Sequence, residues 1–243
     1  NNQINQDHFV LELLSPEPLP QILPGQFVQA RVDGSKSTFL RRPLSVHDVD
    51  YGRNSIKLLI QVVGEGTKFL SRLAPGESLN LIYPLGNSFS MPLPGEKVLL
   101  VGGGCGIAPL LYLAKSLSSD GFKPDILTGF RNKSRIMEKD ELAEYGNVHI
   151  VTEDGSEGVK GVVTTHPVLI QEKFNRIYCC GPEAMMRAIA LHARQNNIFC
   201  EVSLENLMAC GMGVCLCCIV KTTKGNLCSC TNGPVFNINN LLW

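Results

Sequence analysis

Four cysteines in the last part of the chain have the spacing of metal ligands. Cys210, Cys215 and Cys218 are separated by four and by two residues, and Cys230 follows twelve residues after Cys218. Three thiolates in one continuous loop and a fourth further on is the ligand pattern of a plant-type [2Fe-2S] cluster. The spacing therefore predicts a centre that passes single electrons.

Structural zinc is the alternative use of such thiols, but it usually takes two short Cys pairs, which favours iron–sulfur here. Gly211 and Gly213 let the backbone fold closely around inorganic sulfides and aim its amides at them. The fourth ligand is open between Cys230, which stands directly before the turn at 231–234, and Cys228.

Two further segments have the composition of nucleotide-binding turns. The glycine-rich run at 102–109 follows an apolar stretch and places Pro109 where a helix would begin, so its backbone can approach a pyrophosphate. A second turn, at 180–182, follows another apolar stretch, and both turns would lie at the carboxyl edge of a parallel sheet. The nucleotide-binding residues that we predict are Gly103, Gly104, Gly106, Cys180, Gly181 and Pro182.

A nicotinamide moves two electrons as hydride and a [2Fe-2S] cluster moves one, so a flavin is expected between them. Arg42 can bind a phosphate, and the hydroxyl of Ser45 can bond a flavin. Gly66 and Thr67 precede an apparent helix and can offer amides at its start. These four residues are predicted flavin contacts.

These motifs lie in three parts of the chain that differ in their predicted structure. Residues 1–93 contain short apolar runs separated by turn residues, which predicts an antiparallel β-barrel. Residues 94–202 alternate apolar strand, turn and helix, which predicts a Rossmann-like parallel α/β domain with helices on both faces. Residues 203–243 form a cluster segment. The fold class is therefore α+β with three parts, and we expect strands at 98–101, 125–128, 148–152 and 176–180 and helices at 68–73 and 109–117.

The composition excludes several classes of partner. The chain has 243 residues, with 22 basic and 22 acidic side chains. A neutral chain without a basic block gives no footprint for nucleic acid or an anionic membrane. No apolar run reaches the length of a membrane span, and no signal-peptide pattern is present. We expect a cytoplasmic protein whose ten cysteines are reduced thiols.

Taken in order, the motifs resemble the ferredoxin-NADP reductase superfamily, through the segments 24–27, 42–45, 64–67, 102–109 and 180–182. The pattern from Glu205 through Cys218, with the ending 230–236, narrows the resemblance to the electron-transfer subunits of class 1B dihydroorotate dehydrogenase.

The resemblance implies FAD on the barrel, NAD on the sheet domain and a [2Fe-2S] cluster. The implied cluster ligands are Cys210, Cys215, Cys218 and Cys230. The implied flavin contacts include the whole segment Arg42, Pro43, Leu44 and Ser45, together with Gly66 and Thr67, and the resemblance adds the strand residues Leu59, Ile60 and Gln61.

The resemblance also implies a partner subunit that holds FMN and oxidises dihydroorotate in pyrimidine biosynthesis, with two copies of each chain in a heterotetramer. The same module could serve a ferredoxin:NADP transhydrogenase, a sulfide reductase or a hydrogenase. A non-catalytic, zinc-stabilised binding module is the alternative from another class. No side-chain acid or base is required for hydride transfer between flavin and nicotinamide.

Two residue roles stay open at this point. Cys180 can lie near the nicotinamide or serve as a small core residue at a strand end. Asp154 near a strand end could bond the ribose hydroxyls of NAD and repel a 2′-phosphate, whereas Arg131 and Arg135 could favour NADP.

Overall fold

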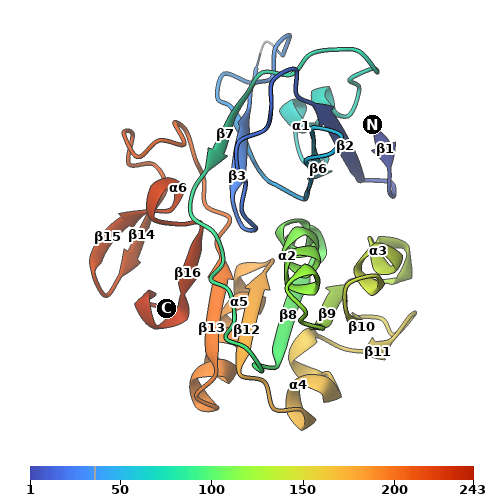
Figure 1. Ribbon diagram of the computed structural model, residues 1–243, viewed down its shortest axis with the longest axis vertical. Coiled ribbons are helices and arrows are strands. Elements are labelled where there is room, and N and C mark those ends of the chain that lie inside the picture. The colour runs from blue at the N-terminus through green and yellow to red at the C-terminus, as the bar shows by residue number, and fades with distance from the viewer. Residues whose placement is uncertain (36) are drawn as a thin grey trace.

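The computed structural model describes residues 1–35 and 37–243. The first part of the chain forms two antiparallel sheets, drawn in blue to teal in Figure 1. One sheet has the order β1 (Asn2–Gln3), β2 (His8–Leu14), β6 (Ser55–Gln61), β5 (Asp48–Asp50), and the other β4 (Arg42–Ser45), β3 (Phe27–Ala30), β7 (Leu81–Leu85). One short helix, α1 (Glu65–Leu70), follows β6.

The predicted antiparallel sheet structure is confirmed, but the described strands pair as two separate sheets and show no closed barrel. Only Val46 and His47 lie between β4 and β5, so the chain passes from one sheet to the other at this corner. A shared core fills the space between the sheets, with Phe9 and Leu58 from one and Val28 from the other. The apolar alternation therefore predicted antiparallel strands correctly. It could not predict that the chain would pass into a second sheet at this corner.

The central part is a seven-stranded sheet with the order β11-β10-β9-β8-β12-β13-β16. Six of its strands are parallel, and the order reverses between β8 and β12, where open parallel sheets bind ligands. The strands are β8 (Val98–Gly103), β9 (Asp125–Phe130), β10 (Asn147–Thr152), β11 (Val159–Lys160), β12 (Arg176–Cys180), β13 (Phe199–Ser203) and β16 (Val235–Asn237).

Helices cover both faces of this sheet, as predicted. Val98 and Leu100 of β8 pack with α2 (Ala108–Ser119) and α3 (Lys139–Ala143), whereas Leu99 and Val101 pack with α4 (Pro167–Gln171) and α5 (Glu183–Gln195). Successive side chains of a strand point to opposite faces, so one continuous apolar run supplies two cores. No helix in the described residues is long and apolar enough to cross a membrane.

The last part of the chain is tied to the central sheet rather than standing apart. It consists of the hairpin β14 (Ile219–Thr222) and β15 (Gly225–Cys228), the turn of helix α6 (Ser229–Asn232), and β16, which pairs antiparallel with β13. Phe236 of β16 lies in the core shared with α5. Figure 1 shows this segment beside β13 and beside the strand β7 that descends from the upper sheets.

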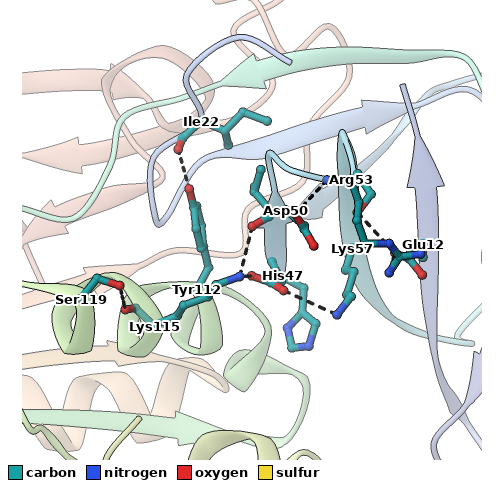
Figure 2. A network of polar contacts seen from close by, with 12 residues as sticks. Glu12, Ile22, His47, Asp50, Arg53, Lys57, Tyr112, Lys115 and Ser119 are labelled. Atoms are coloured by element: carbon teal, nitrogen blue, oxygen red, sulfur yellow. Dashed lines mark hydrogen bonds and ion pairs between the residues drawn. The ribbon is translucent and has the colours of Figure 1, made fainter. Parts of the chain in front are cut away.

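Polar contacts join helix α2 of the central sheet to the upper sheets (Figure 2). Lys115 Nζ lies 2.7 Å from Asp48 Oδ1, and the Tyr112 hydroxyl donates to the carbonyl of Ile22 at 2.9 Å. The buried ring of His47 lies 2.9 Å from the Ala108 carbonyl. Because these groups are buried or half-buried, their hydrogen bonds hold the domains in one orientation.

The packing of β16 generates a first prediction. Phe236→Ala removes a buried aromatic ring and should destabilise the chain by about 3–5 kcal/mol. Urea unfolding followed by the fluorescence of Trp243, the single tryptophan, measures this loss. Leu242→Ala, at an exposed neighbour, is the control and should change little. Equal effects of the two substitutions would show that β16 does not stabilise the sheet.

Candidate functional site

A cleft of about 740 Å³ lies at the carboxyl ends of β8 and β12. The short turn η1 (Gly104–Ile107) and the loop before α5 form one side of it. Five of the six residues that we predicted for nucleotide binding line this cleft, namely Gly103, Gly104, Gly106, Gly181 and Pro182. Two turns that are far apart in the sequence therefore meet at one site.

Close packing explains why glycine occupies these turns. A Cβ at position 106 would lie 2.3 Å from the Cys180 carbonyl oxygen, and one at position 103 would lie 2.6 Å from Met185 Sδ. Gly104 differs, because its φ is +53° and open space lies beside its Cα. A pyrophosphate can approach a backbone closely where a glycine lies open to the cleft, as Gly104 does. The cleft therefore fits a dinucleotide.

Charged side chains lie at the far end of the cleft, where β9 and β10 end. Arg131 and Glu153 line it there, and Arg135 also lines it while forming an ion pair with Asp7. The Asp154 carboxylate accepts a hydrogen bond from the Ser156 amide at 2.9 Å instead. Glu153 is thus a cleft carboxylate that the sequence did not reveal. Glu153 and Asp154 are adjacent, and only the strand register shows which of the two side chains faces the cleft.

The structure places the Cys180 thiol in the core under α2, and burial raises its pKa well above the ordinary value. The thiol that lines the cleft is that of Cys105, whose pKa burial raises to about 12. Both groups are therefore neutral thiols at physiological pH. The proximity of Cys180 to a nicotinamide stays a prediction.

Four of the nine predicted flavin contacts, Arg42, Pro43, Leu44 and Ser45, make up the whole of β4, an edge strand. Helix α1 begins at Glu65, earlier than the predicted 68–73, because the Thr67 hydroxyl accepts hydrogen bonds from the amides of Val63 and Gly64. A Cβ on Gly66 would lie 3.3 Å from Cδ of Arg42. The structure therefore brings Arg42 next to the first turn of α1, where a cation and unpaired amides can share a phosphate.

The side chain of Leu44 packs toward the protein core. It lies opposite Val28 in the register of β3 and β4, and its half-buried side chain packs against the core between the two upper sheets. Directly opposite residues of paired strands share a face, so the leucine side chain faces protein. The backbone of Leu44 is free of this packing, and its predicted contact with a flavin stays a prediction.

The predicted contacts on β6 divide into two kinds. Leu59 and Ile60 are buried in apolar clusters, so their side chains face protein. Gln61 is exposed and lines the cleft. The Leu59 carbonyl lies 3.9 Å from Cys105 Sγ, which places the end of β6 beside η1. Strand β6 thus connects the flavin half to the nucleotide cleft.

The predicted cluster cysteines approach one another in pairs. The amides of Met212 and Cys215, together with the Cys215 thiol, lower the pKa of Cys210 to about 6. Burial and the neighbouring Cys218 raise the pKa of Cys230 to about 12. Across residues 1–35 and 37–243, no three His, Cys, Asp or Glu side chains gather around a point for a single ion.

These pairs fit the donor set of a [2Fe-2S] cluster, in which each of two irons takes two thiolates. Backbone amides also point at the sulfurs: Met212 N lies 3.3 Å from Cys210 Sγ, and Gly213 N lies 3.1 Å from Cys230 Sγ. Cys228 is buried beside Cys218, and burial together with this neighbour raises the pKa of the Cys228 thiol. Because of this position, Cys228 stays the alternative fourth ligand.

The cluster loop, residues 207–218, has an inner and an outer side. On the inner side, Phe27 of β3 packs against Cys218 and Cys230. On the outer side, Cys215 is exposed, and the same loop carries four exposed apolar side chains. These exposed residues are Leu207, Met212, Val214 and Leu216.

The chain is similar to known proteins over most of its length. A family model described as the iron-sulfur cluster binding domain of dihydroorotate dehydrogenase B matches residues 205–242, and an oxidoreductase NAD-binding domain model matches 100–190. A protein of Fusobacterium nucleatum is 35% identical over 97% of this chain and 93% of its own length. One of Caldanaerobacter subterraneus is 42% identical over 88% and 84%. Both are named dihydroorotate dehydrogenase B (NAD(+)), electron transfer subunit.

The chain belongs to this family of electron-transfer subunits. A solved structure described as the NADH-dependent reduced ferredoxin-NADP oxidoreductase is also similar, with a TM-score of 0.89 and 32% identity over 99% of this chain and 87% of that one. The Amycolatopsis cytochrome P450 reductase GcoB, with a TM-score of 0.68 and 23% identity over 81% of this chain and 63% of that one, shares the fold. The matches confirm the predicted resemblance and the predicted [2Fe-2S], FAD and NAD cofactors.

Glu205 lies where the cleft approaches the cluster loop, and sequence reasoning gave it no role beyond its place in the family pattern. The Glu205 side chain is exposed at the cleft, but the protein on its other sides partly desolvates the carboxyl and raises its pKa above the ordinary glutamate value. The folded state thus binds a proton at higher pH than the unfolded state. Stability must fall as pH rises through the window between the ordinary glutamate pKa and the raised one.

We expect Glu205→Gln, which is neutral at every pH, to gain stability relative to the unsubstituted chain as pH rises through this window. The difference should vanish at pH values below the ordinary glutamate pKa. Urea unfolding at a series of pH values measures it, with Glu17→Gln on an exposed loop as control. Parallel pH curves for Glu205→Gln and the unsubstituted chain would contradict the raised pKa.

Proposed function

We propose that this chain carries electrons from a partner subunit that oxidises dihydroorotate, through a [2Fe-2S] cluster and FAD, to NAD⁺ in pyrimidine biosynthesis. The observation that carries the proposal is the identity of 35–42% with electron-transfer subunits of dihydroorotate dehydrogenase B, which extends over the two upper sheets, the cleft and the cluster loop alike.

The spatial order of the three sites supports this route. The cluster loop packs against β3, and β3 pairs with β4, with Gln29 opposite Pro43. The cluster loop and the proposed flavin strand are thus separated by one strand. On the other side of the flavin half, β6 ends at the nucleotide cleft with Gln61. A flavin held by β4 and α1 would lie between the other two sites.

A bound flavin exchanges hydride with nicotinamide and single electrons with an iron–sulfur centre, which is the chemistry that the cofactors supply. The protein's own residues bind and orient. We assign phosphate binding to Arg42 with the amides of Gly66 and Thr67, and pyrophosphate binding to the cleft glycines. The backbone of β4 and of Leu59 to Gln61 orients the flavin, and the loop amides stabilise charge on the cluster sulfurs.

We assign the cluster ligands to Cys210, Cys215, Cys218 and Cys230. The support is the pairing of these thiols and the amide hydrogen bond that Cys230 receives from Gly213. We further propose NAD rather than NADP, because the Glu153 carboxylate lines the cleft end and would repel a 2′-phosphate.

The proposed partner is an FMN-containing catalytic subunit, with two copies of each chain in the complex and a cytoplasmic location. The exposed apolar rim formed by Leu207, Met212, Val214 and Leu216 supports docking at the cluster loop. Clustered exposed apolar side chains are typical of protein interfaces. A partner seated there would lie next to the exposed Cys215 and would exclude water from the cluster.

A second candidate comes from the NADH-dependent reduced ferredoxin-NADP oxidoreductase, to which the chain is 32% identical over 99% of its length. In that case the partner would exchange electrons with ferredoxin and NADP rather than with dihydroorotate. The identity to electron-transfer subunits is higher, which favours the first candidate.

The decisive experiment is isolation of the chain with its partner from the source cells. The complex should contain flavin and iron, and should reduce NAD⁺ when dihydroorotate is added. Reduction of NADP⁺ by ferredoxin without any response to dihydroorotate would establish the second candidate. A colourless protein with zinc and no flavin would overturn both.

The ligand assignment predicts a difference between two neighbouring cysteines. Cys230→Ser should abolish the visible absorbance and the electron paramagnetic resonance signal of the cluster, because one iron loses a thiolate. Cys228→Ser should retain both signals and the iron content, and serves as the matched control. The reverse result would make Cys228 the ligand.

The flavin assignment predicts that Arg42→Ala weakens FAD binding by about 1–3 kcal/mol, because a charge-assisted hydrogen bond to phosphate is lost. Equilibrium dialysis of FAD measures the change. The control is Arg41→Ala, since the Arg41 guanidinium already bonds to Asn80 at 2.6 Å. Equal FAD affinity in Arg42→Ala and the unsubstituted chain would reject the role.

A further inference from the structure

The amide of Gln29 is buried without a hydrogen-bond partner. Its side chain has no solvent exposure, and neither Nε2 nor Oε1 has a partner in the described residues. Leaving such a group unsatisfied costs about 1–3 kcal/mol, and buried polar atoms in proteins are nearly always bonded. An amide in this state indicates a missing partner at its location.

That location is the inner side of the cluster loop. Along β3, Phe27 packs against the cluster cysteines, whereas Val28 points into the core between the two upper sheets. Side chains alternate along a strand, so Gln29 faces the same way as Phe27. A Cβ at position 211 would lie 2.9 Å from Gln29 Nε2, so the amide lies directly against the glycine that follows Cys210.

The loop beside this amide turns several N–H donors toward the cysteine sulfurs. The loop amides of Met212 and Gly213 already point at cysteine sulfurs, which shows that the loop gathers N–H groups toward one region. Ser229 is a second buried side chain with an orphaned atom, Oγ, and the Ser229 backbone amide donates to the Cys218 carbonyl at 3.0 Å. Two of the three buried side chains with orphaned atoms in the described residues thus lie beside the cluster loop.

We propose that Gln29 Nε2 donates a hydrogen bond to a sulfur of the [2Fe-2S] cluster on the side held by Cys210, and thereby raises the cluster's reduction potential. The inference rests on the proposed ligand set. Cluster sulfurs are acceptors and carry the added electron's charge, so a donor stabilises the reduced form more than the oxidised form. Gln29 acts here as a tuning residue and not as a ligand.

The test is Gln29→Met, which keeps the length and volume of the side chain but removes the donor. The one-electron reduction equilibrium of the cluster should shift tenfold toward the oxidised form, which corresponds to about 59 mV. Spectroelectrochemical titration of the holoprotein measures the cluster and FAD potentials separately. The FAD potential should stay unchanged.

Gln26→Met is the matched control. Gln26 precedes β3, and its amide already bonds to the Gly86 carbonyl at 2.9 Å and to the Leu23 amide at 2.8 Å. Its loss should reduce stability without moving the cluster potential. An equal shift in both variants would mean that the potential follows general destabilisation, which overturns the proposal.

A second measurement does not depend on how well a variant folds. With ¹⁵N in glutamine side chains, pulsed electron paramagnetic resonance of the reduced cluster should detect a nitrogen coupling in the unsubstituted protein. The coupling should be lost in Gln29→Met. Absence of the coupling in an unsubstituted protein that contains the cluster would overturn the proposal.

The outcomes separate this inference from the proposed function. An unsubstituted protein without iron would refute the proposed function before Gln29 is tested. An intact cluster whose potential is the same in Gln29→Met refutes only the inference. A shift of the FAD potential with a constant cluster potential also refutes it and would place the amide at the flavin.

Discussion

The pairing of β16 with β13 is the constraint on which the relative position of the sites depends. It fixes the end of the cluster segment on the nucleotide sheet, with Val202 opposite Phe236. The side chain of Asn87, at the exit from β7, adds hydrogen bonds to both the amide and the carbonyl of Val235. The cluster segment is therefore held from two sides, by the parallel sheet and by the chain that leaves the upper sheets.

Because the segment is held in this way, β3 lies between the cluster loop and β4, the strand that we propose for flavin binding. Phe27 and Gln29 face the cluster loop, and the same strand pairs with β4 in register, with Leu44 opposite Val28. A one-residue slip would turn these side chains to the opposite face and place Val28 against the cysteines. The core of the upper sheets, in which Val28 is fully buried, therefore also sets the environment of the cluster.

The sequence predicted the local elements better than the contacts between distant ones. Strand β12 has the predicted bounds, and the glycine turns meet at the predicted edge, since both follow from apolar runs and turn chemistry. The sequence did not reveal β16, because a strand of three residues at a sheet edge leaves no periodic pattern. It also did not reveal the role of Gln29, because a polar residue within an apolar strand is informative only when the loop it faces is known.

The cluster loop shows why the binding of iron and the folding of this segment must be coupled. Without metal, backbone amides favour ionisation of the Cys210 thiol, whereas burial opposes it at Cys230, so the proposed ligands differ in how readily they lose a proton. Iron requires all of them as thiolates and would therefore displace protons as it binds. On the inner side, the Gly213 amide donates to the Cys230 sulfur, and the side chains of Gln29 and Ser229 have unpaired polar atoms, so an anionic sulfur there would be a stronger acceptor for these groups. The unpaired polar groups on the inner side of the loop would therefore favour the cluster-bound state of the proposed site.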